Sequence, residues 1–574
     1  MRAYMACIMT AAVGLASSPW SQHHIAALNH TLRGKVRTLH PFAKPCFSTY
    51  QGAPVMPDPV GCGAVQANYA SPSFRARFPG AYMYEESSIC ASNDSSTDQC
   101  LLNPEDPRDQ RAFANTSCNQ GNLPSYYINV QEPNDVIQAF RFAERSGAHL
   151  VVKNSGHSFQ GDSSTKGALM LWTRNLKHLS RSTHFVPRGC PEHEGHFDAL
   201  TAGAGINCGE AYDFADKNNA TVLCAYSPTV GLSGGFLQSG GHSVLSPAFG
   251  LAADRVLEFA VVTPDGRFRV ANRCRNRDLF WALRGGGGGT FGVVLESTHM
   301  VEPRIPIALA SIQVDAENRS AVTGFMHTLV DATLGLASDG WGGHIYGNRI
   351  VYVNPLIRHQ ECAEKSMSRM IEYAKRNGGV ANVTVEDSFS AVYERFVVRD
   401  AAKVGVSTLI NTRLVPASVF GSRTLKRTLK KHIAVFVHAG GLPYVPVSGP
   451  YLYRGAAGAT SVNPAWRTAL WEYGNAASWT WNSTLAERMA VVQGMQRQHD
   501  ELLALTPGGG AYRNEAYPFN ANWRVDNFGA PYERLLAVKK KYDPRRLLKC
   551  RNCVGWRDED EQSSCYRSFH RIKA

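Results

Sequence analysis

With 574 residues the chain is too long for a single ordinary hydrophobic core, so two or more domains are expected. Hydrophobic residues make up 44% of it and aromatic residues 10%, which excludes an intrinsically disordered chain. The formal net charge of +13 is spread along the sequence without the basic, aromatic-interleaved motifs of nucleic-acid modules, so nucleic acid is not expected as a partner.

The N-terminus carries a secretory pattern. Arg2 is followed by a mainly small and apolar run up to Ser17, which predicts a signal peptide over residues 1–19. No later stretch offers the roughly 20 apolar residues that cross a bilayer, so we expect an exported protein without membrane contact. Seven Asn-x-Ser/Thr sequons agree with export and are candidate glycosylation sites: Asn29, Asn93, Asn115, Asn219, Asn318, Asn382 and Asn482.

Residues 20–122 are rich in Pro, Gly, Ser, Asn and Cys and show little periodicity. This composition predicts an irregular extension tied by disulfides. Its cysteines are Cys46, Cys62, Cys90, Cys100 and Cys118. No cysteine spacing in the chain forms a good zinc pattern, and Cys550 and Cys553 lack a second pair. A disulfide or packing role is favoured for them, and no metal site is expected.

A β-α-β unit follows the extension. Tyr127–Val130 is a predicted strand, Asp135–Ser146 an amphipathic helix that Gly147 ends, and Leu150–Lys153 a second strand. The unit leads into a loop in which His157 stands between Gly156 and Ser158. Gly156 permits positive φ and removes a side chain, so a flat ligand can approach the backbone closely. A solvated histidine on a polar loop is the alternative interpretation.

Two further stretches are unusually rich in glycine. Residues 227–241 read SPTVGLSGGFLQSGG and carry no charge, which is typical of backbone that wraps a polar or anionic ligand; the alternative is a flexible linker. Residues 284–294 read RGGGGGTFGVV and run into a strand. They lack the Gly-Lys-Ser/Thr of a phosphate loop and the strand-then-helix frame of a dinucleotide fingerprint.

The other predicted elements of this region are strands and helices. The sequence predicts strands over Ala168–Trp172 and Ala199–Gly203, a helix over Gly209–Asn218, a strand-like run over Thr221–Ala225, a hairpin of Arg255–Val262 with Arg267–Val270, and a short helix over Asp278–Leu283.

Ile305–Ala504 predicts a second, α+β domain. Its strands are expected over Ala308–Val314 and Gly343–Val353, and its helices over Ala321–Leu334 and Cys362–Asn377. The basic cluster Arg423–Lys431 is interpreted as one polar helix face and Lys539–Lys541 as a helix end. Near the C-terminus, Gly508–Phe519 is a loop or strand that carries Tyr512, Asn514 and Glu515, and it precedes a predicted helix over Tyr532–Tyr542.

Five motifs follow one another along the chain: KNSGHS, PTVG…GG…GG, the AD–VLE hairpin, LFWALRGGGGGTFGVV and the closing NEA…W…FG…Y…LL…KKKYDP. In this order they resemble the vanillyl-alcohol-oxidase (PCMH) type of FAD-binding domain. They are most similar to the berberine-bridge-enzyme-like oxidases, especially secreted fungal members. The resemblance covers roughly Leu123 to the C-terminus. It implies an α+β fold with an FAD-binding domain of two α+β subdomains (123–304), a substrate domain with an antiparallel sheet (305–504) and a C-terminal segment (505–574) that returns to the FAD domain.

The same resemblance implies that FAD is the cofactor, joined covalently to His157 through its 8α-methyl carbon. The other residues it implicates in FAD binding are Lys153, Asn154, Ser155, Gly156, Ser158, Gly161, Pro228, Thr229, Val230, Gly231, Gly234, Gly235, Gly240, Gly241, His242 and Val262. Many relatives carry a second tether, a cysteine directly before Pro-Thr-Val-Gly. Here that position is Ser227, with Cys224 three residues earlier, so a single covalent link is predicted.

The function expected from the resemblance is an oxidase. A small-molecule substrate would give a hydride to flavin N5, and O2 would reoxidise the flavin and yield H2O2. Tyr512 is the expected base, supported by Asn514 and Glu515, and it would need a nearby charge or donor such as Arg513 or His242. A secondary-metabolism alcohol is favoured as substrate over a sugar. A flavin-binding glycoprotein without catalysis is the alternative of another class, and a monomer is expected.

Overall fold

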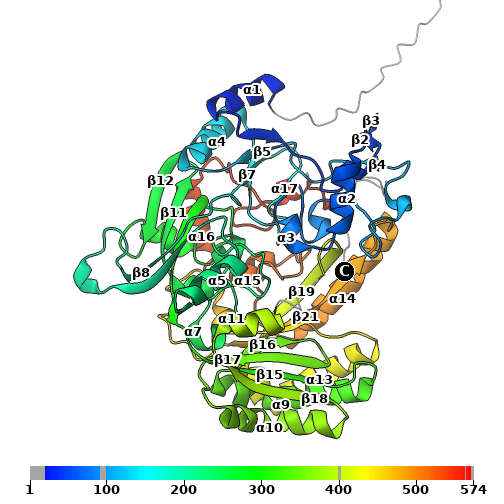
Figure 1. The fold of residues 1–574 in the computed structure, drawn as a ribbon, viewed down its shortest axis with the longest axis vertical. Helices are drawn as coiled ribbons and strands as arrows, with labels where there is room; N and C mark the ends of the chain where they lie inside the picture. The colour runs from blue at the N-terminus through cyan, green and yellow to red at the C-terminus, as the bar shows by residue number, and fades with distance from the viewer. Residues whose placement is uncertain (1–19, 91–98, 398–402, 563, 571–574) are drawn as a thin grey trace, which may run out of the picture.

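In a computed structural model, residues 20–90, 99–397, 403–562 and 564–570 are described. The expected signal peptide and the sequon Asn93 lie outside the described residues. Figure 1 shows two halves: an upper part built from both ends of the chain and its first three hundred residues, and a lower part formed by the middle of the chain. The expected α+β class is confirmed.

The first sheet of the upper part contains the predicted β-α-β unit. Its four strands run in the order β1 (Val36–Thr38), β5 (Tyr126–Asn129), β7 (Leu169–Trp172) and β6 (Leu150–Lys153). Strands β5, β7 and β6 are parallel, while β1 is antiparallel to β5. Helix α4 (Pro133–Ser146) connects β5 to β6, begins with a proline in its first turn and ends at Gly147, whose φ is 71°. This unit fixes where the His157 loop leaves β6.

The second sheet is antiparallel and has five strands in the order β12 (Arg267–Asn272), β11 (Val256–Thr263), β13 (Val293–Met300), β9 (Phe197–Gly203) and β8 (Leu179–Phe185). The predicted hairpin is confirmed, with Thr263 opposite Arg267. The predicted helices appear as α5 (Cys208–Lys217) and α8 (Arg277–Ala282). The expected strand over Thr221–Ala225 is limited to β10 (Ala220–Thr221), because only these residues pair with β14 (Glu302–Pro303).

The lower part is a five-stranded antiparallel sheet with helices on one face (Figure 1). Its strands run in the order β18 (Val380–Glu386), β15 (Ile307–Gln313), β17 (Arg349–Asn354), β16 (Gly342–Ile345) and β20 (Val445–Val447). Helices α9 (Arg319–Asp339), α10 (Gln360–Arg376) and α13 (Arg423–His438) share a hydrophobic core with it. The single strand expected over Gly343–Val353 was wrong: the chain reverses at Gly347, with φ of 70°, and forms a hairpin.

Two long strands lie between the halves. β19 (Ser407–Pro416) pairs antiparallel with β21 (Ala469–Trp479), and α14 (Leu485–Leu505) packs against them. The C-terminal segment then returns to the upper part, where α15 (Trp523–Phe528) and α16 (Tyr532–Tyr542) share a hydrophobic core with α8 and β11. Lys539, expected at an exposed helix end, is instead buried, and its ammonium contacts Asp543 at 2.6 Å.

The N-terminal extension is more regular than expected. It contains α1 (Gln22–Thr31), capped by Ser21, and α2 (Pro59–Ala67), capped by Asp58, and it contributes β1 to the first sheet. The expected disulfide ties are present as Cys46–Cys62, Cys100–Cys118 and Cys90–Cys565. Further pairs are Cys190–Cys274, Cys208–Cys224 and Cys550–Cys553.

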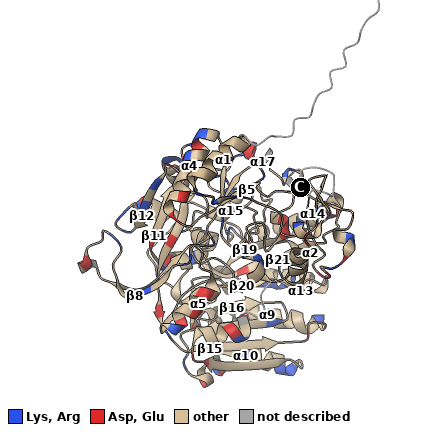
Figure 2. Ribbon diagram, turned by 45° about the horizontal axis from the view of Figure 1, so that its top comes forward, with Lys and Arg blue, Asp and Glu red and all other residues tan. Residues whose placement is uncertain are grey.

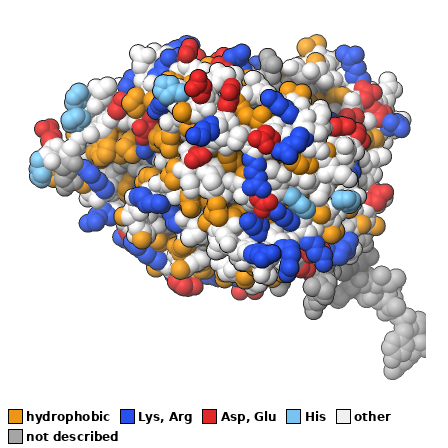
Figure 3. Space-filling model, turned by 90° about the horizontal axis from the view of Figure 1, so that it is seen from below, with side chains coloured by type: hydrophobic (Ala, Val, Ile, Leu, Met, Phe, Trp, Pro, Cys, Tyr) orange, Lys and Arg blue, Asp and Glu red, His pale blue; other side chains and the backbone are white. Residues whose placement is uncertain are grey.

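Shorter elements complete the described chain: β2 (Thr49–Tyr50), β3 (Ala53–Pro54), β4 (Ser117–Cys118), α3 (Pro72–Arg75), α6 (Gly235–Gln238), α7 (Ser246–Phe249), α11 (Phe389–Val392), α12 (Ala417–Gly421), α17 (Asp558–Gln562) and α18 (Arg567–His570). Within the described residues, no helix combines the length and the apolar character needed to cross a membrane. Basic and acidic side chains are interspersed over the ribbon and over the lower end of the molecule (Figures 2 and 3).

Candidate active site

A cavity of about 780 Å³ lies where the two halves meet. Loops of the upper part form one side of it, and β19, β21 and residues next to β16 and β20 form another. The histidine loop, both glycine-rich stretches and the 512–515 segment all reach this cavity. Four segments that the sequence places far apart are therefore brought to one site.

His157 lies on the wall of this cavity, near the start of the loop that follows β6. Gly156 has φ of 89°, and a Cβ there would lie 3.0 Å from the carbonyl oxygen of Ala81, so the chain passes too close for a side chain. The imidazole Nε2 lies 2.7 Å from the Thr229 hydroxyl. Burial, with a smaller effect of the Lys153 charge, lowers the pKa of His157 to about 3, so the ring is neutral at physiological pH.

The glycine-rich stretches pack backbone against backbone. A Cβ on Gly288 would lie 2.7 Å from the Gly235 Cα, and one on Gly231 would lie 2.6 Å from the Asn154 carboxamide. The cavity beside them is thus walled by bare backbone. The amide oxygens of Asn154 and Gln238, both on this wall, are buried and lack a hydrogen-bond donor. Such a wall suits a flat ligand that carries both N–H donors and anionic groups, as FAD does.

The residues expected to bind FAD divide into two groups. Those that line the cavity are Asn154, Ser155, Gly156, His157, Ser158, Val230, Gly231, Gly234, Gly235 and His242. Those outside its lining are Lys153, Gly161, Pro228, Thr229, Gly240, Gly241 and Val262. The second group supports the wall or the core behind it.

Two members of the second group show why they do not reach the cavity. The Lys153 ammonium donates to the carbonyl oxygen of Phe78 at 3.2 Å and lies 4.7 Å from the centre of the Tyr82 ring, outside the cavity lining, so its contact with FAD stays a prediction. Burial, then the charge of Arg75, lowers its pKa to about 7. The Val262 side chain is fully buried in the core beside β13, so only its backbone is left for the predicted contact with FAD.

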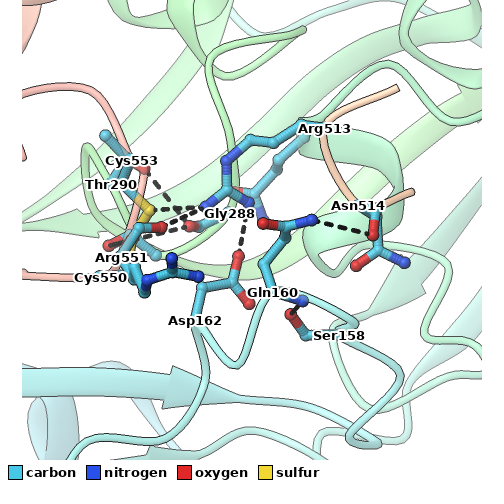
Figure 4. A network of polar contacts seen from close by, with 12 residues as sticks. Ser158, Gln160, Asp162, Gly288, Thr290, Arg513, Asn514, Cys550, Arg551 and Cys553 are labelled. Atoms are coloured by element: carbon cyan, nitrogen blue, oxygen red, sulfur yellow. Dashed lines mark hydrogen bonds and ion pairs between the residues drawn. A yellow bond between two sulfur atoms is a disulfide. The ribbon is translucent and has the colours of Figure 1, made fainter. Parts of the chain in front are cut away.

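Asn514 joins the C-terminal segment to the histidine loop. Its side chain accepts the backbone N–H of Phe159 at 3.2 Å and donates to the carbonyl oxygen of His157 at 3.3 Å. Gln160 completes the junction by donating to the carbonyl oxygen of Ala516 at 2.8 Å. The position of His157 therefore depends on residues more than 350 positions away in the chain. Figure 4 shows the neighbouring contact between Gln160 and Asn514.

The guanidinium of Arg513, expected as a charge or donor that would activate Tyr512, is bonded to other groups. It pairs with Asp162 at 2.5 Å and donates to the carbonyl oxygen of Arg551 at 3.1 Å (Figure 4). Tyr512 instead faces acidic groups: burial, then the charges of Glu515 and Glu472, raises its pKa well above the usual value. The surroundings of Tyr512 thus hold its hydroxyl protonated and do not favour the role of base.

Glu515 and His242, both expected at the site, contact each other, with Nε2 of the histidine 3.2 Å from Oε1 of the glutamate. A third group, Glu472 on β21, was not predicted from the sequence. It is buried, accepts the Thr412 hydroxyl at 2.6 Å and places Oε2 3.7 Å from the same His242 Nε2. The ligand atoms of His242, Glu472 and Glu515 lie within 4.8 Å of one another, a spacing that either a shared proton or a cation can occupy.

Aromatic side chains on the cavity wall were also missed: three come from the N-terminal extension and the lower part of the molecule, and two stand beside the motifs that the sequence analysis singled out. They are Tyr84, Phe159, Tyr226, Tyr346 and Tyr444. Tyr84 and Phe159 stack with ring centres 3.6 Å apart. At the position of a second tether, Ser227 lines the cavity, and Cys224 is held in a disulfide with Cys208.

Comparisons with known proteins identify the family of this chain. Residues 124–272 match the family model described as FAD binding domain, and residues 511–555 match the one described as berberine and berberine like. The chain is 38% identical to FAD-linked oxidoreductase ffsJ of Aspergillus flavipes over 94% of this chain and 93% of that one. It is 36% identical to FAD-linked oxidoreductase cheF of Chaetomium globosum over 94% and 88% of the two chains.

Solved structures show the same architecture. The VAO-type flavoprotein MtVAO615 from Myceliophthora thermophila C1 superposes with a TM-score of 0.82 at 28% identity, covering 94% of this chain and 96% of that one. A glucooligosaccharide oxidase from Acremonium strictum shares the fold, with a TM-score of 0.62 at 19% identity over 75% of this chain and 91% of its own.

Proposed function

This chain belongs to the FAD-linked oxidoreductases of the vanillyl-alcohol-oxidase type, and from that premise we propose that it is an oxidase whose FAD is attached through His157 alone. The observation that carries the proposal is a neutral imidazole on the wall of the large cavity, next to two glycine-rich stretches that leave backbone bare. Bound FAD supplies the hydride acceptor and the reaction with O2 that yields H2O2.

The residues that would hold FAD are those of the cavity wall described above. Backbone N–H groups of the glycine-rich stretches would face its phosphates, and the unpaired amide oxygens of Asn154 and Gln238 would accept from its N–H groups. The disulfide at Cys224 and the serine at position 227 support a single tether, because neither offers a thiol.

The protein's own part in the oxidation is to orient the substrate and take its proton. We assign the role of proton acceptor to Glu515, a residue that lines the cavity and whose carboxylate is held by His242. Tyr512, protonated and beside it, would donate a hydrogen bond to the substrate oxygen. When an alcohol is the substrate, its C–H leaves as hydride and its O–H proton passes to Glu515, so a carbonyl product forms.

The lining of the cavity favours an apolar substrate. The stacked Tyr84 and Phe159 face the part of the cavity next to β19 and β21. Its other lining residues are Val406, Ile410 and Ala476, beside the hydroxyl groups of Thr408 and Ser478. Such a wall excludes water and binds a small aromatic or terpenoid alcohol better than a sugar. We therefore keep a natural-product alcohol as the substrate class. Export of the protein is supported by its disulfides.

The experiment isolates the protein from culture supernatant and measures the mass of the peptide that contains His157. The expected result is one FAD on this peptide in the wild type and none in His157→Ala, which should retain flavin only by non-covalent binding. Apolar alcohols should bleach the flavin under anaerobic conditions and release H2O2 in air, and oligosaccharides should not. An unmodified His157 peptide from a yellow protein would refute the tether, and bleaching by sugars alone would refute the substrate class.

A further inference from the structure

At the cavity wall, one imidazole lies next to two buried carboxyl groups. His242 Nε2 lies 3.2 Å from Glu515 Oε1 and 3.7 Å from Glu472 Oε2, so its single N–H is within hydrogen-bond distance of Glu515 only. Thr412 donates to the other oxygen of Glu472 at 2.6 Å. The remaining oxygens, Oε2 of both glutamates, are buried without a donor. The N–H of His242 and the O–H of Thr412 thus leave one oxygen of each glutamate without a hydrogen-bond donor, and two ionised carboxylates would be incompletely paired here.

Neighbouring elements supply no further positive charge to this cluster in the described structure. The groups that interact with it are His344 on β16, Tyr444 before β20, Tyr84 and Tyr512, and Arg513 lies next to Tyr512. Burial lowers the pKa of His344 to about 3, and burial raises the pKa of Tyr444 and Tyr512, so all three are neutral. The charge of Arg513 is taken up by Asp162.

Two carboxylates this close, in the absence of a second cation, cannot both be ionised at modest cost, so one of them retains a proton. Glu472 is the more enclosed, with 1% of its surface exposed against 8% for Glu515, and it does not line the cavity. Burial, then the charge of Glu515, raises the pKa of Glu472 to about 8. The hydrogen bond and charge of Glu515 outweigh burial and raise the pKa of His242.

We propose that Glu472 is a positioning residue that stays protonated during the oxidation, so that the His242 N–H is committed to Glu515 and fixes that carboxylate toward the substrate. This inference rests on the proposed function, in which Glu515 accepts the substrate proton. When Glu472 loses its proton at alkaline pH, two carboxylates compete for one imidazolium, and Glu515 loses its fixed orientation. The titration belongs to the whole cluster.

A first test needs no substrate. Infrared spectra of the holoenzyme should contain the C=O band of a buried protonated carboxyl group that disappears as the pH is raised through the alkaline range, and Glu472→Gln should remove it. Glu86→Gln is the matched control, because Glu86 is another buried carboxyl whose pKa burial raises, bonded separately to the Thr408 N–H at 2.9 Å. That variant should leave the Glu472 band in place. If the difference spectrum between the wild type and Glu472→Gln shows no lost C=O band, the proposal is overturned; a band that only Glu86→Gln removes belongs to Glu86 and is expected to persist.

Elemental analysis of the same samples decides the rival occupant. A stoichiometric divalent metal that is present in the holoenzyme and lost in Glu472→Gln would replace the shared proton with a cation site and overturn the proposal.

The second test follows the rate of flavin reduction against pH, with the alcohol that bleaches the flavin. In the wild type the rate should fall about tenfold per pH unit above the pKa of the cluster, whereas in Glu472→Gln this alkaline fall should be absent. A uniform loss at every pH, with the alkaline fall retained, would indicate a merely structural role and refute the proposal. If no alcohol is oxidised, the proposed function fails while the infrared result still decides the protonation of Glu472.

Discussion

At the scale of single residues, one hydroxyl group lies against the histidine through which we propose that FAD is attached. Thr229 Oγ1 lies 2.7 Å from His157 Nε2, and Thr229 itself lies outside the cavity lining, so it holds the ring from behind. Thr229→Val keeps the shape and removes the bond. A hydrogen bond of about 1 kcal/mol corresponds to roughly fivefold slower covalent attachment of FAD.

Attachment can be followed as the flavin that remains with the protein after acid precipitation, sampled over time with added FAD. The matched control is Thr221→Val, whose hydroxyl donates to the carbonyl oxygen of Pro303 at 3.1 Å in the small β10–β14 pair. It should attach FAD at the wild-type rate. Equal rates for Thr229→Val and the wild type would mean that Thr229 does not orient His157.

The same scale shows what a sequence can disclose about a site. His157 could be predicted as a site residue because the glycine before it and the strand pattern ahead of it are local signals. Glu472 was not, because alternation along Trp471, Glu472 and Tyr473 is ordinary for a strand. Its importance arises from pairing with β19, which brings Thr412 to its carboxylate, and from His242 arriving from another part of the chain.

At the scale of elements, the close packing of the two glycine-rich stretches sets the width of the cavity beside them, in which we propose that FAD binds. A Cβ on Gly288 would meet the backbone of Gly235 at 2.7 Å, and backbone cannot rotate away as a side chain can. Gly288→Ala should therefore push the two stretches apart, costing about 1–3 kcal/mol of folding stability and most of the bound flavin.

The matched control for that substitution is Gly335→Ala. Gly335 lies within α9, where a Cβ would meet nothing within 4 Å, so alanine should stabilise the helix by up to about 1 kcal/mol. Thermal unfolding of both variants, together with flavin absorbance per mole of protein, checks the contrast. Full flavin content in Gly288→Ala would show that the packing of the two glycine-rich stretches tolerates a side chain at position 288.

Elements were predictable where the signal was local. The hairpin of β11 and β12 follows from its Pro-Asp-Gly turn, and α16 from its apolar spacing. Helix α2 was missed because Gly61 and Gly63 lower its intrinsic helix propensity, and it is held instead by the Asp58 cap and the disulfide Cys46–Cys62. Tertiary support of this kind leaves little trace in a local pattern.

At the scale of the whole molecule, the cavity is a product of non-local assembly. The disulfide Cys90–Cys565 spans 475 residues and ties the N-terminal extension to the C-terminal segment, and both contribute to the surroundings of His157. The resemblance anticipated that the C-terminal segment returns to the FAD domain. It did not anticipate that Tyr84, from the extension, stacks on Phe159 at the cavity wall.

The stability of the assembled molecule should fall steeply in acid because histidines are buried as neutral rings. His299 on β13 is 1% exposed, bonds to Ser297 Oγ at 2.7 Å, and burial lowers its pKa to about 3. Between pH 6.5 and about 3, the unfolded chain binds a proton at His299 that the folded chain does not. Folding stability therefore rises with pH across this window and is lost as the pH falls.

Each such histidine contributes a slope of about 1.4 kcal/mol per pH unit at acidic pH. His299→Gln keeps a polar group that can bond to Ser297 and does not titrate, so its stability in urea should fall less steeply with decreasing pH, by about that slope. His438→Gln, at an exposed position on α13, is the control and should keep the wild-type slope. An unchanged slope in His299→Gln would contradict the prediction, because it would mean that His299 binds its proton equally in the folded and unfolded chain despite its burial in β13.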